Sequence, residues 1–257
     1  MKNVEHPPRR TARRLAVISD FHLGRPGAPL ACQVPTEDIL AAVKELRSMA
    51  DLIVVNGDLF DLERGTAPFL KRELRLLEAV HFRVVDALTG PEFAWVRGNH
   101  DRVLLELGRA FPALDVELPC GLFRIEHGDR FNAFIKRNES FTTAMTWLSG
   151  RLQIAPALQP IYKTMRAADH LLTGAATAKD EPIVAKSAEW LETEPGYRGM
   201  VIGHTHIPIL HEGANGRRVM NPGGSTDIVH ALIVENEQAE LFRWKDGAFE
   251  SLLSRAI

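Results

Sequence analysis

The sequence is poor in cysteine, with only Cys32 and Cys120 among its 257 residues. Two cysteines are too few for a disulfide framework, and they fit a protein of a reducing compartment. Long apolar runs are also missing, and the leader MKNVEHPPRRTARR lacks the apolar core of a secretory signal. We therefore expect a cytoplasmic protein whose residues 1–13 form a flexible tail.

Neither sign of charge is in excess, because 31 Lys and Arg residues stand against 33 Asp and Glu residues, for a formal net charge of -2. A nearly neutral chain has no overall field that attracts a polyanion, so nucleic acid is not an expected partner. Hydrophobic residues make up 45% of the chain. That fraction is enough for the core of one large α/β domain spanning 1–257.

Five short apolar runs predict buried strands, because they are rich in Val and Ile and too short for helices. They cover residues 15–19, 52–56, 93–97, 122–126 and 200–202. Amphipathic segments at 36–49 and 69–88 predict helices between the first three strands. Strands that alternate with helices are typical of a largely parallel sheet with helices packed against it.

The pattern changes after the fourth strand. Residues 131–194 form a long, mainly helical segment with recurring aromatic residues, which predicts a helical insertion or lid between two strands. After it, segments 217–221, 231–235 and 239–244 predict antiparallel strands, the last two joined by a turn at 236–238. Asn221 opens an Asn-Pro-Gly-Gly segment that is either a plain turn or a loop near a site.

Polar residues that can bind a metal follow each of the five strands. They are Asp20 and His22, Asp58, Asn99 with His100 and Asp101, His127, and His204 and His206. The carboxyl ends of parallel strands meet at one edge of a sheet, so these side chains are expected to converge. Taken singly, an Asp here could cap a helix, Asn99 could be a turn residue and His127 could be a hydrogen-bonded structural residue. Together, buried without a cation, they would leave unpaired polar groups, so their joint occurrence predicts a metal site.

In order, Asp-x-His, Gly-Asp, Gly-Asn-His-Asp, His-Gly and Gly-His-x-His are motifs of the calcineurin-like metallophosphoesterase superfamily, which the chain resembles from Asp20 to His206. The resemblance implies a layered α/β sandwich of mixed sheets flanked by helices. It also implies two divalent cations that share Asp58 as a bridging ligand. The first would be bound by Asp20, His22, Asp58 and His206, and the second by Asp58, Asn99, His127 and His204.

Carboxylate, amide and imidazole ligands suit Mn, Fe or Zn better than Ca, and Mn²⁺ is the expected cation. Two such cations would supply a metal-bound hydroxide that attacks a phosphodiester, phosphomonoester or pyrophosphate. His100 is not needed as a ligand, so its imidazole is expected to protonate the leaving oxygen or stabilise the transition state. Asp101 is expected to hydrogen-bond that imidazole, with helix capping as the alternative.

The insertion and residues 51–60 also resemble the UDP-2,3-diacylglucosamine hydrolases of lipid A synthesis. That resemblance implies a lid over a nucleotide-linked lipid, and hence a peripheral membrane contact. One departure is His100, because that group typically has Arg after the metal-binding Asn, whereas general phosphodiesterases and phosphatases have His. The expected substrate is therefore a phosphorylated small molecule or a nucleotide-linked compound. A nuclease of the same fold and a non-catalytic interaction module are the alternatives.

Overall fold

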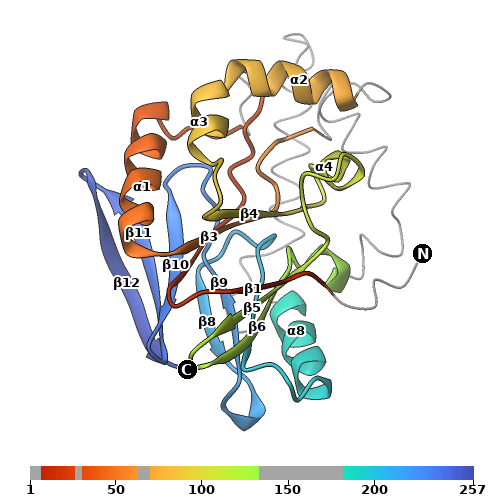
Figure 1. Cartoon of the computed structure of the whole chain (residues 1–257), viewed down its shortest axis with the longest axis vertical. Coiled ribbons are helices and arrows are strands. Elements are labelled where there is room, and N and C mark those ends of the chain that lie inside the picture. The colour runs from red at the N-terminus through yellow and green to blue at the C-terminus, as the bar shows by residue number, and fades with distance from the viewer. Residues whose placement is uncertain (1–6, 27–30, 63–69, 133–181) are drawn as a thin grey trace, which may run out of the picture.

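The computed structural model describes residues 7–26, 31–62, 70–132 and 182–257, and two six-stranded sheets form its centre (Figure 1). Sheet I has the order β12-β11-β10-β2-β3-β4, and sheet II has the order β1-β5-β6-β7-β9-β8. The strands of sheet I are β2 (Leu15–Ile18), β3 (Leu52–Asn56), β4 (Phe93–Val96), β10 (His230–Glu235), β11 (Gln238–Lys245) and β12 (Ala248–Ala256). Those of sheet II are β1 (Arg9–Thr11), β5 (Leu114–Leu118), β6 (Gly121–Ile125), β7 (Gly199–Val201), β8 (Ile209–Glu212) and β9 (Arg218–Asn221).

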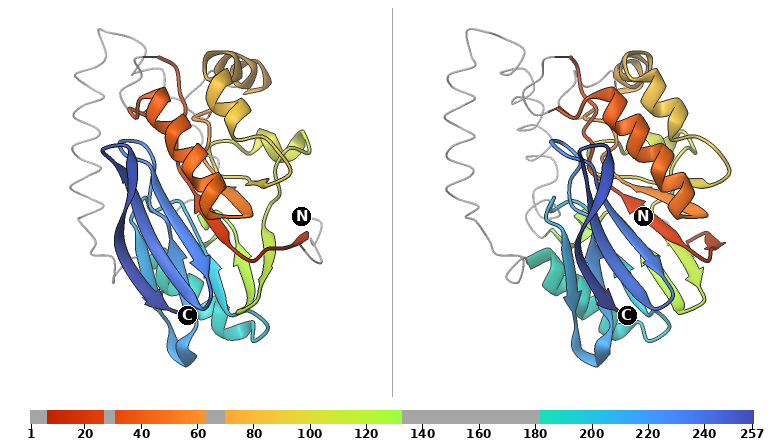
Figure 2. Two further views of the ribbon diagram at one scale, coloured as in Figure 1. Left: turned by 60° about the vertical axis from the view of Figure 1, so that its left-hand side comes forward. Right: turned by 90° about the vertical axis from the view of Figure 1, so that its left-hand side faces the viewer.

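The parallel strands of sheet I, β2, β3 and β4, are buried on both faces. Along β2, Ala16 and Ile18 belong to the core under the helices, whereas Leu15 and Val17 pack against sheet II, as the two-residue alternation of a strand requires. The helices over the first core are α1 (Thr36–Met49), α2 (Leu70–Val80) and α3 (Phe82–Ala87). The outer face of sheet II is covered by α8 (Pro182–Thr193), so the layers run helix, sheet, sheet, helix (Figure 2).

This arrangement confirms the expected sandwich of mixed sheets with flanking helices. The parallel strands β2, β3 and β4 are joined in sheet I to the antiparallel strands β10, β11 and β12. Among the described residues, no helix is both long enough and apolar enough to cross a bilayer. The described part of the chain also contains three short helical elements, α4 (Val103–Glu106), η1 (Asp129–Phe131) and η3 (Ala214–Gly216).

Three sequence-based expectations need correction. The helix expected at 69–88 is interrupted at His81, whose φ of -107° and ψ of 24° leave the helical range, while its Nε2 lies 2.7 Å from the carbonyl oxygen of Gly24. Strand β9, expected as an antiparallel strand, is antiparallel to β8 but also pairs in parallel with β7, in sheet II. Part of the expected tail is also ordered, because β1 pairs in parallel with β5.

Two other expectations fall largely outside the described residues. Residues 133–181 of the helical insertion and residues 1–6 of the tail are not described. Of the insertion, the structure describes η1 at its start and α8 at its end.

Candidate metal centre

The five polar segments follow parallel strands of the two sheets, and they converge where the carboxyl ends of these strands meet. The amide N–H of Asp20 donates to the carbonyl oxygen of Gly57 (3.1 Å), which joins the first two segments. Across the sheets, Nδ2 of Asn56 donates to the carbonyl oxygen of Glu126 (3.1 Å). The amide of Gly203 donates to the carbonyl oxygen of His127 (3.0 Å). The site is thus built by both sheets of the sandwich, whereas the alternation of strands and helices taken alone indicated one parallel sheet.

The first group of candidate ligands is Asp20, His22 and His206, whose donor atoms all lie within 4.8 Å of one another. The Nε2 atoms of His22 and His206 are 3.1 Å apart, and Nε2 of His206 is 3.4 Å from Oδ1 of Asp20. The carboxylate of Asp20 is fully buried and also accepts the amide of His204. A cation at this point would meet one carboxylate and two imidazoles.

The second group is Asp58, His127 and His204, again with donor atoms within 4.8 Å of one another. Nε2 of His127 lies 3.2 Å from Oδ2 of Asp58 and 3.2 Å from Oδ1 of Asn99. Its other ring nitrogen, Nδ1, lies 3.0 Å from the carbonyl oxygen of Asn56. That contact favours a proton on Nδ1 and leaves Nε2 to face the centre of the site.

Asp58 joins the two groups. Its Oδ2 is 3.2 Å from Nε2 of His127 in one group and 3.7 Å from Nε2 of His22 in the other. Its Oδ1 accepts the amide of His100 at 2.8 Å, which fixes the carboxylate against the segment after β4. The carboxylate therefore occupies the position that a bridging ligand would need.

The backbone is strained at the same residues. Asp20, His22, Asp58, His204 and His206 have φ values of 55°, 51°, 51°, 66° and 59°. Residues other than glycine seldom adopt this left-handed conformation, and it is kept mainly where surrounding structure enforces it. Here it turns the chain directly after a strand and directs side chains to a common point.

Burial and the neighbouring charges shift the pKa values of the candidate ligands in different directions. Burial would lower the pKa of His127, but the charge of Asp58 and a hydrogen bond to it raise that pKa to about 10. Burial would raise the pKa of Asp20, yet neighbouring imidazoles lower it to about 2. Burial lowers the pKa of His22 to about 3 and that of His204 to about 4. The Asp20 carboxylate is thus ionised and the imidazoles of His22 and His204 are neutral, whereas His127 would have to release a proton to bind a cation.

The donor set fits divalent cations of the borderline class. Each group combines an Asp carboxylate with imidazoles, and Asn99 adds an amide oxygen to the second group. Such ligands suit Mn, Fe or Zn. The residues that the sequence predicted as ligands are therefore brought together, and a third group, formed by His22, Asp58 and His100, connects the other two.

His100 lies beside this centre, but its partner differs from the prediction. Its ring is 4.8 Å from that of His22 between centroids, and its Nδ1 is 3.0 Å from Oδ1 of Asp61. Asp101, which was expected to orient it, instead accepts the amides of Gly98 (2.7 Å) and Leu59 (2.8 Å). Burial, with the nearby charge of Asp58, raises the pKa of Asp101 to about 6.

The hydrogen bonds that the structure describes for the Asp101 carboxylate go neither to His100 nor to an amide of α4. This carboxylate joins the segments after β3 and β4. Asp61 was missed because nothing in its spacing separates it from an ordinary loop residue. Asn221 proves to be near the site, since its Nδ2 donates to the carbonyl oxygen of Gly203 (2.8 Å) and to Oγ1 of Thr205 (2.9 Å).

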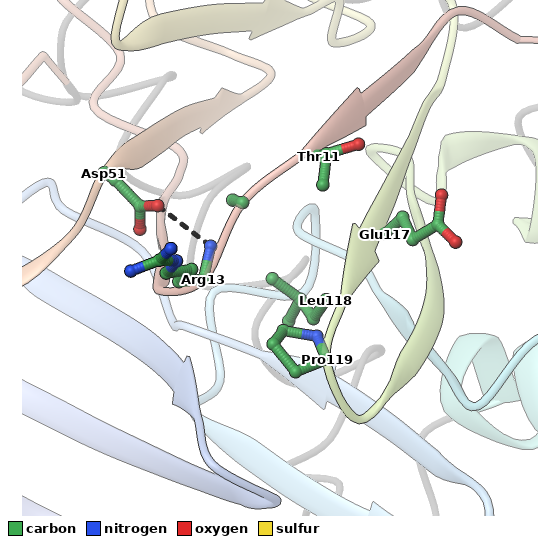
Figure 3. A pocket seen from close by; sticks show the side chains of 7 residues that line it. Thr11, Arg13, Asp51, Glu117, Leu118 and Pro119 are labelled. Atoms are coloured by element: carbon green, nitrogen blue, oxygen red, sulfur yellow. Dashed lines mark hydrogen bonds between the residues drawn. The ribbon is translucent and has the colours of Figure 1, made fainter.

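An open cavity of about 570 Å³ lies elsewhere, at the amino end of β3 (Figure 3). Asp51 lines it and accepts the amide of Arg13 (2.9 Å), with Glu117, Leu118 and Pro119 across from them. None of its lining residues belongs to the metal centre, from which it is separated by the length of β3. It is therefore no part of the candidate site.

Comparisons with known proteins place the chain in a family. A model of the family described as calcineurin-like phosphoesterase matches residues 13–208. No curated protein matches the chain significantly. A solved dimetal phosphatase from Danio rerio is similar, with a TM-score of 0.51 and 12% identity over 93% of this chain and 97% of that chain. Zn²⁺-bound Vps29 from Entamoeba histolytica has a TM-score of 0.47 and 14% identity over 93% and 97% of the two chains. At such identities the likeness concerns the fold alone.

Proposed function

The chain belongs to the calcineurin-like phosphoesterase family, and from this premise we propose that it is a metal-dependent phosphoesterase with a dinuclear centre. The observation that carries the proposal is the pair of carboxylate and imidazole groups that meet at Asp58. Cations that share one carboxylate lie close enough together to act on one phosphoryl group. Mn²⁺ is the proposed cation, with Fe or Zn as alternatives.

Each cation would take four protein ligands. The first would be held by Asp20, His22, Asp58 and His206, and the second by Asp58, Asn99, His127 and His204. When bound, the two cations would make a coordinated water more acidic and would neutralise charge on the phosphoryl oxygens. The residues themselves hold these positions rigidly, because Asp20, Asp58 and His127 are almost completely buried.

His100 would supply the proton that the leaving oxygen needs. Its side chain is 14% exposed, so it can reach a bound substrate, and its backbone amide is anchored on Asp58. With Nδ1 held by Asp61, the remaining nitrogen, Nε2, is the one that would donate to the leaving group. The contact with Asp61 fixes the ring orientation that this step requires.

The proposed substrate is a phosphorylated small molecule or a nucleotide-linked compound, cleaved at a phosphodiester, phosphomonoester or pyrophosphate bond. A UDP-linked lipid of the diacylglucosamine type is one candidate within this class, and it would bring the protein into peripheral contact with a membrane from the cytoplasm. The phosphate-cleaving centre is common to all of these substrates.

A panel of substrates tests the proposal. Metal-free protein is reconstituted with Mn²⁺ and assayed on p-nitrophenyl phosphate, bis-p-nitrophenyl phosphate, ADP, a UDP-linked lipid and single-stranded DNA. We expect cation-dependent hydrolysis of at least one phosphoester, which Asp58→Asn abolishes and the exposed turn variant Asp246→Asn retains. If metal analysis shows bound cations and no substrate is cleaved, the chain is a binding module instead.

A further inference from the structure

His230 lies outside the five polar segments, yet it contacts a loop that supports the metal centre. It begins β10, and its side chain is partly buried. Nδ1 of its imidazole lies 2.7 Å from the carbonyl oxygen of Gly224. Because a carbonyl oxygen can only accept a hydrogen bond, Nδ1 carries the proton and donates it. The imidazole therefore holds one carbonyl group of the segment that joins β9 to β10.

The segment that His230 holds, residues 221–225, is the supporting loop. All of its residues are buried. At its start, Nδ2 of Asn221 donates to the carbonyl oxygen of Gly203 (2.8 Å), which belongs to the turn after β7, and Oδ1 of Asn221 accepts the amide of Gly223 (2.8 Å). Near its end, the loop is held by the imidazole of His230. Two side chains thus fix the supporting loop at two points.

The supporting loop contacts two residues of the first ligand group. The amide of Gly224 donates to the carbonyl oxygen of His206 (3.2 Å), and the amide of Ser225 donates to the carbonyl oxygen of Asp20 (3.1 Å). The backbones of His206 and Asp20 are left-handed, with φ values of 59° and 55°. Such a conformation persists only where the surrounding structure enforces it. The two hydrogen bonds from the loop help to enforce it at these ligands.

Gly224 also packs against the imidazole of His206. A β-carbon at position 224 would lie 2.9 Å from Cβ, Cγ and Nδ1 of His206, so the backbone of the glycine forms a wall for this side chain. The side chain of His206 is 40% exposed, whereas Asp20 and His22 are almost completely buried. His206 therefore depends more than the other two ligands on a wall of this kind. The position of Gly224 limits how far the imidazole can turn away from a cation.

The second ligand group is held by other contacts. Nδ1 of His127 lies 3.0 Å from the carbonyl oxygen of Asn56, and Oδ1 of Asp58 accepts the amide of His100 (2.8 Å). Neither contact involves the supporting loop. His204 follows Gly203 directly, in the turn that is bound by Asn221 rather than by His230. A change at His230 should thus reach the first cation and spare the second.

We propose that His230 is a positioning residue for the first cation. Through the carbonyl oxygen of Gly224 it keeps the supporting loop against His206, and it thereby sets the affinity for that cation. This inference rests on the proposed function, because the cation concerned is one of the two in the proposed dinuclear centre. Removal of a group that orients a metal ligand typically lowers metal affinity by about tenfold to a hundredfold. His230 acts through one further residue, so the low end of this range is expected.

Calorimetric titration of the metal-free protein with Mn²⁺ tests the inference. His230→Phe keeps an aromatic ring but removes the N–H donor. The dissociation constant of one cation should rise by about tenfold, while that of the other stays within about twofold of the wild-type value. His230→Asn should recover part of the affinity, because its amide nitrogen is as many bonds from the α-carbon as Nδ1 is. His211→Phe, which replaces a partly buried histidine of β8, is the matched control and should change neither constant.

Two ligand variants identify which cation responds. His204→Ala removes a ligand of the second cation, and His206→Ala removes a ligand of the first. Addition of His230→Phe should weaken binding of the cation that remains in His204→Ala, but should leave binding of the cation that remains in His206→Ala unchanged. The reverse pattern, or equal losses in both variants, would contradict the assignment to the first cation.

Activation by Mn²⁺ separates positioning from a merely structural role. His230→Phe should need about tenfold more Mn²⁺ than the wild type for half-maximal hydrolysis, and its kcat at saturating Mn²⁺ should stay within about twofold of the wild-type value. A kcat that excess Mn²⁺ does not restore, together with a lower free energy of unfolding of the metal-free protein, would show general destabilisation and overturn the positioning role.

The same titrations separate this inference from the proposed function. If the wild type binds two cations and His230→Phe weakens the first, but no phosphoester is hydrolysed, the positioning role stands and the proposed function fails. If the wild type hydrolyses phosphoesters but His230→Phe binds both cations as tightly as the wild type does, the positioning role alone fails.

Discussion

Nδ1 of His100 lies 3.0 Å from Oδ1 of Asp61, a carboxylate that is almost completely buried. The two residues are 39 positions apart and come from the segments after β4 and β3. Because one imidazole nitrogen is fixed in this way, the orientation of the ring and the position of its second nitrogen are also fixed. Several expected outcomes follow from this pair and from the groups around it.

Removing the charge of Asp61 should slow turnover without loss of metal. Asp61→Asn keeps the size of the side chain but replaces the charged partner of Nδ1 of His100 with a neutral amide, which holds the ring less firmly. We expect kcat to fall by about tenfold to a hundredfold, as is usual for residues that orient a functional side chain. Steady-state kinetics with metal analysis measure this effect. An unchanged kcat would mean that the pair has no part in the reaction.

Removing the imidazole itself should have a larger effect. His100→Ala should reduce turnover by about 10²- to 10⁴-fold, the usual contribution of general acid catalysis, with both cations still bound. His211→Ala, on β8, is the control for loss of a histidine. The donor atoms of His100 lie within 4.8 Å of those of His22 and Asp58, so His100 could instead be a ligand. Loss of a cation from the variant would support that alternative.

Asp58→Asn should impair both cation sites, because one carboxylate lies between the two groups. Elemental analysis after dialysis should give well under two cations per chain, whereas Asp246→Asn should equal the wild type. Replacement of any residue that serves one group, such as His206, should affect one cation only. Two cations at full occupancy in Asp58→Asn would refute the bridging role.

Gly98 has no side chain, and Asp58 fills the space that a side chain at position 98 would need. A β-carbon at position 98 would overlap the backbone nitrogen and the carboxylate of Asp58, so Gly98→Ala should displace this residue. We expect weaker metal binding and a free energy of unfolding lower by about 1–3 kcal/mol. Gly196→Ala, where no atom lies within 4 Å of the added carbon, is the control. Chemical denaturation and metal titration compare the two variants.

Asp51 lies at the amino end of β3, away from the metal centre, and should make the free energy of unfolding depend on pH. Burial would raise its pKa, but the amides of Arg13 (2.9 Å) and Arg14 (2.6 Å) lower it below the ordinary value of 3.8. A lowered pKa stabilises the folded state above pH 3.8 and ceases to do so as pH falls through the folded-state value. Asp51→Asn should therefore be less stable than the wild type at pH about 7, and the gap should narrow towards pH about 3. Urea denaturation at both pH values measures the gap, and a constant gap would contradict this account.

The sequence by itself determined which residues could act together. Apolar runs of four or five residues define β2, β3 and β4, and the polar residues that follow each run identify the candidate ligands from Asp20 to His206. Strand length, the alternation of side chains and the chemistry of ligand types are local properties. They can be inferred without knowing how the chain folds on itself.

The tertiary structure alone decided which groups meet and what each one contacts. It placed β6 and β7 in a second sheet, so two sheets rather than one deliver the ligands. It gave His100 the partner Asp61, because backbone amides already occupy the carboxylate of Asp101. It also set Arg102 beside Asp129. These contacts join residues far apart in the chain, and their distances depend on how whole strands and turns pack, which no local pattern of residues encodes.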